Sequence, residues 1–169
     1  MLTHPCESVS LSLVSTDLPV WSVVKTGATL YSKEQDRFHL LLTEPKVIDR
    51  LAEEGQASYP RTPQGVSLQT ANSPRLLWLE ISPYRLIMTM QGNGRFSYRH
   101  YWERGVYGLS RYWLQSELQT NLEQLRLRNF TRRLVLQGHP LPEYLQLEYE
   151  LWSDRVQLGS YVLNLEIHH

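Results

Sequence analysis

The sequence predicts a mainly antiparallel α+β protein: a strongly curved sheet or open barrel of about ten short strands, with one long and one short helix. Short runs that alternate apolar and polar residues recur at spacings of about 8 to 12 residues. Turn-forming residues such as glycine, proline, asparagine and aspartate separate most of these runs. No internal repeat and no linker is visible, so we expect a single globular domain, residues 1–169.

Composition and charge argue against several classes of protein. Seventeen basic residues balance 17 acidic residues, so a polyanion binder driven by bulk charge is not expected. The single cysteine, Cys6, cannot form an internal disulfide and fits a reducing compartment. The sequence shows neither a signal-peptide pattern nor an apolar stretch of about 18 residues, so we expect a cytoplasmic protein without membrane insertion.

The N-terminal part is predicted to form strands. Residues 7–14 alternate apolar residues with serines, which is the period of a half-buried strand. Residues 20–25 and 29–31 repeat this alternation, and residues 38–42 form another short strand after a charged turn. The chain therefore opens with β structure.

A short helix is predicted within residues 43–55. Thr43-Glu44-Pro45 is a favourable start, because proline tolerates the first helical turn and an acid there favours the helix dipole, and Gly55 is a favourable stop. Its apolar face consists of Val47, Ile48 and Leu51. Residues 56–74, which contain three prolines, are predicted to form a long surface loop.

The clearest predicted element is a β-hairpin from Tyr84 to Arg104, which follows a strand at residues 76–82. Glycine and asparagine accept positive φ angles, and Gly92-Asn93-Gly94 is predicted to be a three-residue loop. The resulting inner face is apolar and aromatic and pairs Met90 with Phe96, Met88 with Tyr98, Leu86 with His100 and Tyr84 with Trp102. The outer face is polar and pairs Gln91 with Arg95, Thr89 with Ser97, Ile87 with Arg99 and Arg85 with Tyr101.

A second, longer helix is predicted after the hairpin. Ser110 is a suitable N-cap, and the helix is expected to fray near Arg128. Leucines at spacings of four, four and three residues form its apolar stripe: Leu114, Leu118, Leu122 and Leu125. We expect this helix to pack on the sheet.

The C-terminal part is predicted to return to strands. Residues 131–137 and 144–152 flank a turn rich in glycine and proline, and the second of these runs alternates apolar and polar residues. A tight turn at residues 153–155 leads into a last strand, residues 156–167. The inward parity of that strand changes at Gly159, which we interpret as a β-bulge.

The most suggestive functional surface is a series of arginines and tyrosines: Arg95, Arg99, Tyr101, Arg104, Tyr107 and Arg111. The arginines of such a face can bind carboxylates or phosphates, and its aromatic rings can stack on bases. A solvated strand face also carries arginine merely to keep a sheet soluble. The acidic strand at residues 146–150 offers a further explanation, since its carboxylates could pair with Arg95 and Arg99 in the same fold or across a homodimer.

An alternative site is a ligand cavity inside the sheet, lined by Glu80, Met88, Phe96, Tyr98, His100 and Trp102. A barrel of about eight or more strands can enclose a small molecule. Core packing explains the same apolar face, and we favour it. Glu80 has two interpretations: an acid of raised pKa on the apolar face, or a residue that faces water while its neighbours are buried. We favour the second.

Catalytic and metal chemistry lack support in the sequence. Cys6 lies beside His4 and Glu7, but residues this close on either side of Pro5 rarely hold catalytic geometry. The six histidines show no His-x-x-x-His spacing, and one cysteine cannot form a Cys-x-x-Cys motif. No acid and base can be paired as a catalytic couple. We therefore expect no enzyme, no metal and no cofactor.

Residues 127–167 contain the runs NFTR, PLPEYL and YELW, and in these they resemble the C-terminal part of uncharacterised cyanobacterial proteins. The resemblance implies context alone: a cytosolic protein that serves a photosynthetic or other large complex. A tetrapyrrole-handling barrel of the lipocalin-like lyase kind would fit that context, although the signature residues of that family are missing.

Three functions follow from these patterns. The leading hypothesis is a non-enzymatic binding or assembly protein whose hairpin surface docks an acidic protein partner or a second copy of the chain. The first alternative is a lipocalin-like carrier of a hydrophobic or tetrapyrrole ligand. The second alternative, less favoured, is an RNA-associated accessory subunit of a larger complex.

Overall fold

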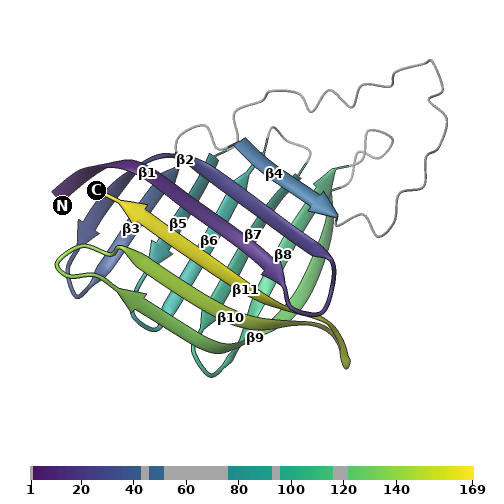
Figure 1. Ribbon diagram of the computed structural model, residues 1–169. Helices are drawn as coiled ribbons and strands as arrows, with labels where there is room; N and C mark the ends of the chain where they lie inside the picture. The colour runs from purple at the N-terminus through teal and green to yellow at the C-terminus, as the bar shows by residue number, and fades with distance from the viewer. Residues whose placement is uncertain (1, 43–45, 52–75, 93–95, 116–121) are drawn as a thin grey trace, which may run out of the picture.

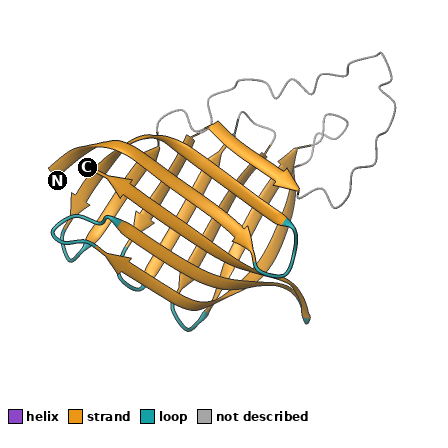
Figure 2. Ribbon diagram, in the orientation of Figure 1, coloured by secondary structure: helices purple, strands orange, loops and turns teal. Residues whose placement is uncertain are grey.

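The computed structural model describes residues 2–42, 46–51, 76–92, 96–115 and 122–169. Within these ranges the secondary structure consists of strands joined by turns, with no helix (Figure 2). The strands are β1 Leu2–Ser15, β2 Val20–Lys33, β3 Arg37–Leu42, β4 Lys46–Leu51, β5 Leu76–Ile81, β6 Arg85–Gln91, β7 Phe96–Glu103, β8 Tyr107–Gln115, β9 Leu122–Gln137, β10 Tyr144–Ser153 and β11 Val156–His168.

The strands close into a ten-stranded antiparallel barrel (Figure 1). The order is β1-β11-β10-β9-β8-β7-β6-β5-β3-β2, and pairing of β2 with β1 closes the ring. β2 pairs with β3 over Ala28–Lys33 and with β4 over Val20–Lys25. β4 therefore continues the line of β3 along β2 rather than adding a position to the ring.

Alternate residues along the strands point into the barrel and form one core. Side chains of Leu30, Leu79, Leu86, Leu145 and Leu165 are fully buried. Burial of each such leucine contributes about 2 kcal/mol to stability. The fold thus depends on the two-residue period that the sequence displays.

The predicted short helix is wrong. Lys46–Leu51 is the strand β4, in which Val47 and Ile48 pair with Val24 and Val23 of β2. Valine and isoleucine are stiff at the first side-chain torsion and favour strands over helices. Thr43-Glu44-Pro45 and Gly55, the expected helix ends, lie outside the described residues, as does the loop predicted at residues 56–74.

The predicted long helix is also wrong. Ser110–Gln115 and Leu122–Arg128 belong to the antiparallel strands β8 and β9, in which Tyr112 faces Leu125 and Ser110 faces Leu127. Leu118 of the predicted stripe lies outside the described residues. Leu114 lies on β8, and Leu122 and Leu125 lie on β9. Their spacing along the chain nevertheless fits the apolar stripe of a helix, which explains the wrong prediction. Pairing of β8 with β7 over Ser110–Leu114, and of β9 with β10 from Arg128 onward, stabilises the extended form.

The central hairpin has the predicted faces but a different register. Met90 pairs with Tyr98, Met88 with His100 and Leu86 with Trp102, so every pair is displaced by two residues from the prediction. A shift of two residues keeps each side chain on its face, because side chains alternate with a period of two. The connection from Gly92 to Phe96 is longer than the three-residue loop, and Gly92 N donates to Phe96 O at 3.1 Å.

The predicted C-terminal hairpin and its bulge are confirmed, whereas Val156 and Leu158, which the predicted parity placed on the inner side, are exposed. Strands β10 and β11 meet in a tight turn at Asp154, which has a φ angle of 51°. Leu151 pairs with Gly159 and Trp152 with Gln157, so the extra residue of the predicted bulge lies next to Gly159.

In the part of the chain that the structure describes, no helix has the length and apolarity needed to cross a membrane.

Candidate anion-binding hollow on the outer face

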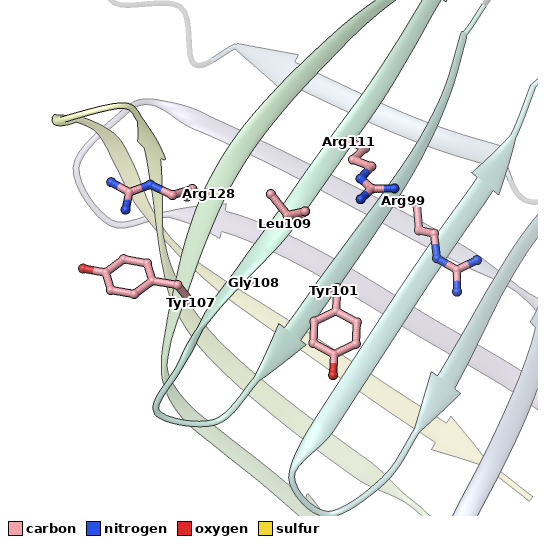
Figure 3. A pocket seen from close by; sticks show the side chains of 7 residues that line it. All are labelled: Arg99, Tyr101, Tyr107, Gly108, Leu109, Arg111 and Arg128. Carbon is pink, nitrogen blue, oxygen red and sulfur yellow. The ribbon is translucent and has the colours of Figure 1, made fainter.

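A hollow of about 520 Å³ lies on the outside of the barrel, over β7, β8 and the adjoining part of β9 (Figure 3). Arg99 and Tyr101 point outward because they alternate along β7 with the buried residues His100 and Trp102. The hollow is lined by Arg99, Tyr101, Tyr107, Gly108, Leu109, Arg111 and Arg128.

Strand register places three arginines side by side across the outer face. Arg99 of β7 lies opposite Arg111 of β8, which lies opposite Arg126 of β9. Residues directly opposite in an antiparallel pair have Cβ atoms about 5 Å apart, and like charges at such positions destabilise the sheet. This row therefore maintains positive charge at a cost in stability.

Few carboxylates offset this charge. Glu80 Oε1 lies 3.7 Å from Arg99 Nη2, at the β5 side of the row. Arg126 donates from Nε and Nη2 to the neutral Gln124 Oε1, both at 3.1 Å. Arg111 Nε is buried and has no hydrogen-bond partner among the described residues.

Aromatic side chains lie among these arginines. The guanidinium of Arg128 lies 5.1 Å from the centroid of the Tyr107 ring, and Tyr107 contacts Phe130 at 5.0 Å between centroids. The Tyr101 hydroxyl donates to Glu103 Oε2 at 2.8 Å, which fixes the ring at the edge of the hollow. Cation–π contact orients a guanidinium without neutralising it.

Gly108 lines the hollow, and the fully buried Asn129 lies next to it on β9. A Cβ atom at Gly108 would lie 2.0 Å from the backbone oxygen of Tyr101, so β8 can approach β7 here only with glycine. Asn129 Nδ2 donates to Tyr101 O at 3.1 Å and to Ser110 Oγ at 2.9 Å. The buried amide thus links β9 to β7 and β8 next to the hollow.

The same polar network reaches His100. Ser110 Oγ lies 2.8 Å from His100 Nδ1 inside the barrel. Burial lowers the pKa of His100 to about 3, so the imidazole is neutral near pH 7. Because Ser110 Oγ accepts from Asn129, its own hydroxyl proton is available for donation to His100 Nδ1.

The acidic strand predicted to compete for these arginines has other partners. Glu148 pairs with Arg133 at 4.0 Å, and Glu150 pairs with Arg132. Glu150 also accepts from Trp152 Nε1 at 3.1 Å. Within the described fold, the carboxylates of β10 pair with β9 rather than with Arg99.

The structure brings four of the six predicted binding residues together in the hollow: Arg99, Tyr101, Tyr107 and Arg111. Arg104 is exposed in the turn after β7 and does not line the hollow, and Arg95 lies outside the described residues. Sequence reasoning missed Arg128 because residues 110–128 were interpreted as a helix. The alternation of leucine with glutamine and arginine over residues 124–128 is a strand signal that could have revealed it.

The residues of the alternative cavity site do not share one face. Glu80 lies on the outer face, beside Arg99, while Leu79 and Ile81 on either side of it are buried. The remaining five residues point into the barrel, with Phe96 at its end: Met88, Phe96, Tyr98, His100 and Trp102.

A chain of ring contacts crosses the barrel interior. His100 stacks on Trp102 with centroids 4.7 Å apart, Trp102 contacts Tyr149 at 5.1 Å, and Tyr149 stacks on Tyr161 at 5.3 Å. Trp102 is fully buried, and its Nε1 has no hydrogen-bond partner among the described residues. An unpaired buried N–H costs about 1–3 kcal/mol.

Thiol and metal chemistry receive no support from the geometry. Cys6 is buried, and burial raises the pKa of its thiol, which keeps it in the unreactive protonated form. Among the residues that the structure describes, no three His, Cys, Asp or Glu side chains are grouped to hold a metal ion.

Comparison with known proteins shows a related fold. The chain is similar to the ywiB protein from Bacillus subtilis, with a TM-score of 0.55 and 12% identity over 99% of this chain and 94% of that chain. A conserved protein of unknown function with a hot dog fold from Alicyclobacillus acidocaldarius is 11% identical over 100% of this chain and 80% of that chain. Its TM-score of 0.19 is too low to support a structural argument.

No protein-family model matches the chain, and no curated protein matches it. At 12% identity, the likeness to the ywiB protein shows the barrel fold alone.

Proposed function

We propose that this protein is a non-enzymatic binding protein that docks an acidic protein partner on its arginine face. We define the arginine face as the outer surface of β7, β8 and β9 formed by Arg99, Tyr101, Tyr107, Arg111, Arg126 and Arg128. The observation that carries the proposal is the cross-strand row Arg99, Arg111 and Arg126, which lies beside an open hollow. Guanidinium groups bind carboxylates in bidentate geometry, and an acidic partner would relieve the repulsion within the row.

The extent of the arginine face favours a protein partner over nucleic acid. Carboxylates bound the face on several sides: Glu80 on β5, Glu103 at the end of β7 and Glu150 on β10. A nucleic-acid backbone needs a positive groove that tracks it over several nucleotides. A compact patch bounded by acids fits a short carboxylate-bearing segment better, and the zero net charge of the chain agrees with this.

Charge reversal tests the proposal. The double variant Arg99→Glu/Arg111→Glu is expected to lose a partner that co-purifies with the tagged wild-type protein from its own cells. The matched control Lys33→Glu/Arg37→Glu makes the same charge change at two exposed residues of β2 and β3 that do not belong to the face, and it should keep the partner. A partner that remains bound to the first variant, with circular dichroism showing an intact fold, would refute the proposal.

A second candidate function is a carrier of a hydrophobic or tetrapyrrole ligand inside the barrel. The closed ten-stranded barrel and the unpaired N–H of Trp102 favour it. Native mass spectrometry of the wild-type protein should then reveal a co-purifying small molecule, with lower occupancy in Trp102→Phe, which keeps a ring but removes the N–H donor. Wild-type protein that carries no molecule and does not bind added biliverdin would count against this function.

A further inference from the structure

We infer, building on the proposed function, that the hollow binds one bulky apolar side chain of the partner, with aspartate or glutamate residues on either side of it in the partner's sequence. The hollow of about 520 Å³ exceeds what one carboxylate needs and falls in the range of about 300–1,000 Å³ that is typical of small-molecule pockets. A ligand that fills the hollow therefore needs a bulky uncharged group in addition to a carboxylate.

The centre of the hollow is apolar. Tyr107 and Leu109 extend outward on either side of Gly108, whose backbone contributes to the floor (Figure 3). Tyr107 is 57% exposed and Leu109 is 38% exposed, so both present apolar surface to solvent. Burial of such surface by an aromatic or large aliphatic side chain is the usual source of affinity at the centre of an interface.

Positive charge lies on two sides of this centre. Leu109 lies between Arg128 on one side and Arg111 and Arg99 on the other (Figure 3). A carboxylate on each side of an apolar anchor would thus meet a guanidinium. No carboxylate of the described residues pairs with Arg111, so its charge is not neutralised within the described fold.

Arg128 is already held in place for such contact. Its Nη2 donates to the backbone oxygen of Asp154, and its guanidinium lies over the Tyr107 ring. A guanidinium that is held by neutral groups keeps its full charge and loses little side-chain entropy on binding. The arrangement favours a defined acid–apolar–acid segment over a diffuse polyanion.

Fluorescence anisotropy with synthetic peptides tests the inference on the full chain. The probes are labelled Glu-Asp-Glu-Trp-Glu-Asp-Glu, the same peptide with glycine in place of tryptophan, and a neutral peptide, Ser-Gly-Ser-Trp-Ser-Gly-Ser. We expect the acidic tryptophan peptide to bind at least about tenfold more tightly than either of the others. The Leu109→Asn variant should lower its affinity toward that of the acidic glycine peptide, whereas Lys33→Glu/Arg37→Glu should not change it.

The outcomes separate this inference from the proposed function. Equal affinity for the two acidic peptides would contradict the inference that the hollow binds an apolar side chain. It would not contradict the proposal that the partner is acidic. Failure of both acidic peptides to bind at low salt would contradict the proposed function itself. Tighter binding of a labelled thymidine decamer than of the acidic tryptophan peptide would replace both with single-stranded nucleic acid as the ligand.

Discussion

Arg99 and Arg111 lie directly opposite each other on neighbouring strands, although like charges at such positions destabilise a sheet. Arg111 also lies opposite Arg126, so it experiences repulsion from both sides. Residues kept at a cost in stability are characteristic of functional surfaces. The Arg99–Arg111 pair therefore supports a binding role for this surface and predicts that removing one of the two charges stabilises the fold.

Neutralising Arg111 should stabilise the free protein. Arg111→Gln keeps most of the aliphatic stem and removes the charge, and we expect the free energy of unfolding to rise by about 0.5 kcal/mol at low salt. The gain should shrink at about 0.5 M salt, which screens exposed charges. Urea unfolding at both salt concentrations measures the effect. The control Arg155→Gln, at an exposed residue in the turn between β10 and β11 with no residue opposite it, should change stability by less than this, and a loss of stability in Arg111→Gln would contradict the role of repulsion.

Replacing Gly108 should be strongly destabilising. A Cβ atom at this position meets the Tyr101 carbonyl at 2.0 Å, so Gly108→Ala must separate β8 from β7, at an expected cost of about 3 kcal/mol or more. Gly27→Ala is a matched control, because a Cβ there meets nothing within 4 Å. Thermal unfolding compares the two, and a Gly108→Ala protein as stable as the control would show that the close approach is not required.

Loss of the Asn129 amide should destabilise the packing of β7, β8 and β9 next to the hollow. Asn129→Ala removes the hydrogen bonds to Tyr101 O and Ser110 Oγ and leaves buried groups unpaired, so we expect a loss of about 2–3 kcal/mol. Amide hydrogen exchange should accelerate most in β8 and the adjoining part of β7. Uniform acceleration across the barrel would instead indicate a general loss of stability.

Stability should fall as pH decreases because of His100. Its pKa is about 3 in the folded protein, below the unfolded value of 6.5, so the unfolded chain binds more protons between these values. The destabilisation is absent above pH 6.5 and grows toward pH 3, reaching about 2–3 kcal/mol near pH 4.5.

His100→Phe keeps an aromatic ring and removes this titration. The difference in unfolding free energy between pH 7 and pH 4.5 should therefore be about 2–3 kcal/mol smaller in the variant than in the wild type. Urea titrations at several pH values measure the difference. Parallel pH profiles for the two proteins would show that His100 is not the buried titrating group.

Residues with a clean two-residue period were predicted correctly from the sequence. Leu145, Leu147 and Tyr149 alternate with polar residues and do lie inside the barrel, and the parity change at Gly159 does mark a bulge. These features depend on neighbours within one strand or one turn. Local pattern is sufficient for them.

The hairpin register and the second helix required non-local information. The faces of Tyr84–Arg104 follow from alternation, but the length of the connection set the register two residues away from the predicted one. Leu114 and Leu125 fit a helical spacing as well as two paired strands, and the pairing of β8 with β7 on one side and with β9 on the other decides between them. Such partners cannot be read from spacing along the chain.

The candidate site was only partly predictable, because local sequence identifies its arginines but not the strand pairing that brings them together. Arg99 and Arg111 were identified because each lies in a segment with many arginines and tyrosines. Their direct opposition, and the contribution of Arg128 to the same hollow, follow from the pairing of three strands. Glu80 was assigned correctly to the polar side by the burial of its two neighbours in the strand.

The seam between β1 and β11 brings the two ends of the chain together. Val9 pairs with Ile167 and Ser8 with His168, and the two termini lie at the same end of the barrel (Figure 1). Ring closure therefore involves the pairing most distant in sequence, and we expect pairings of this kind to form slowly and to leave strand edges unpaired until they form. The same proximity means that a short linker would join the end of β11 to the start of β1. New ends opened in the turn at residues 34–36 would then leave every strand pair intact.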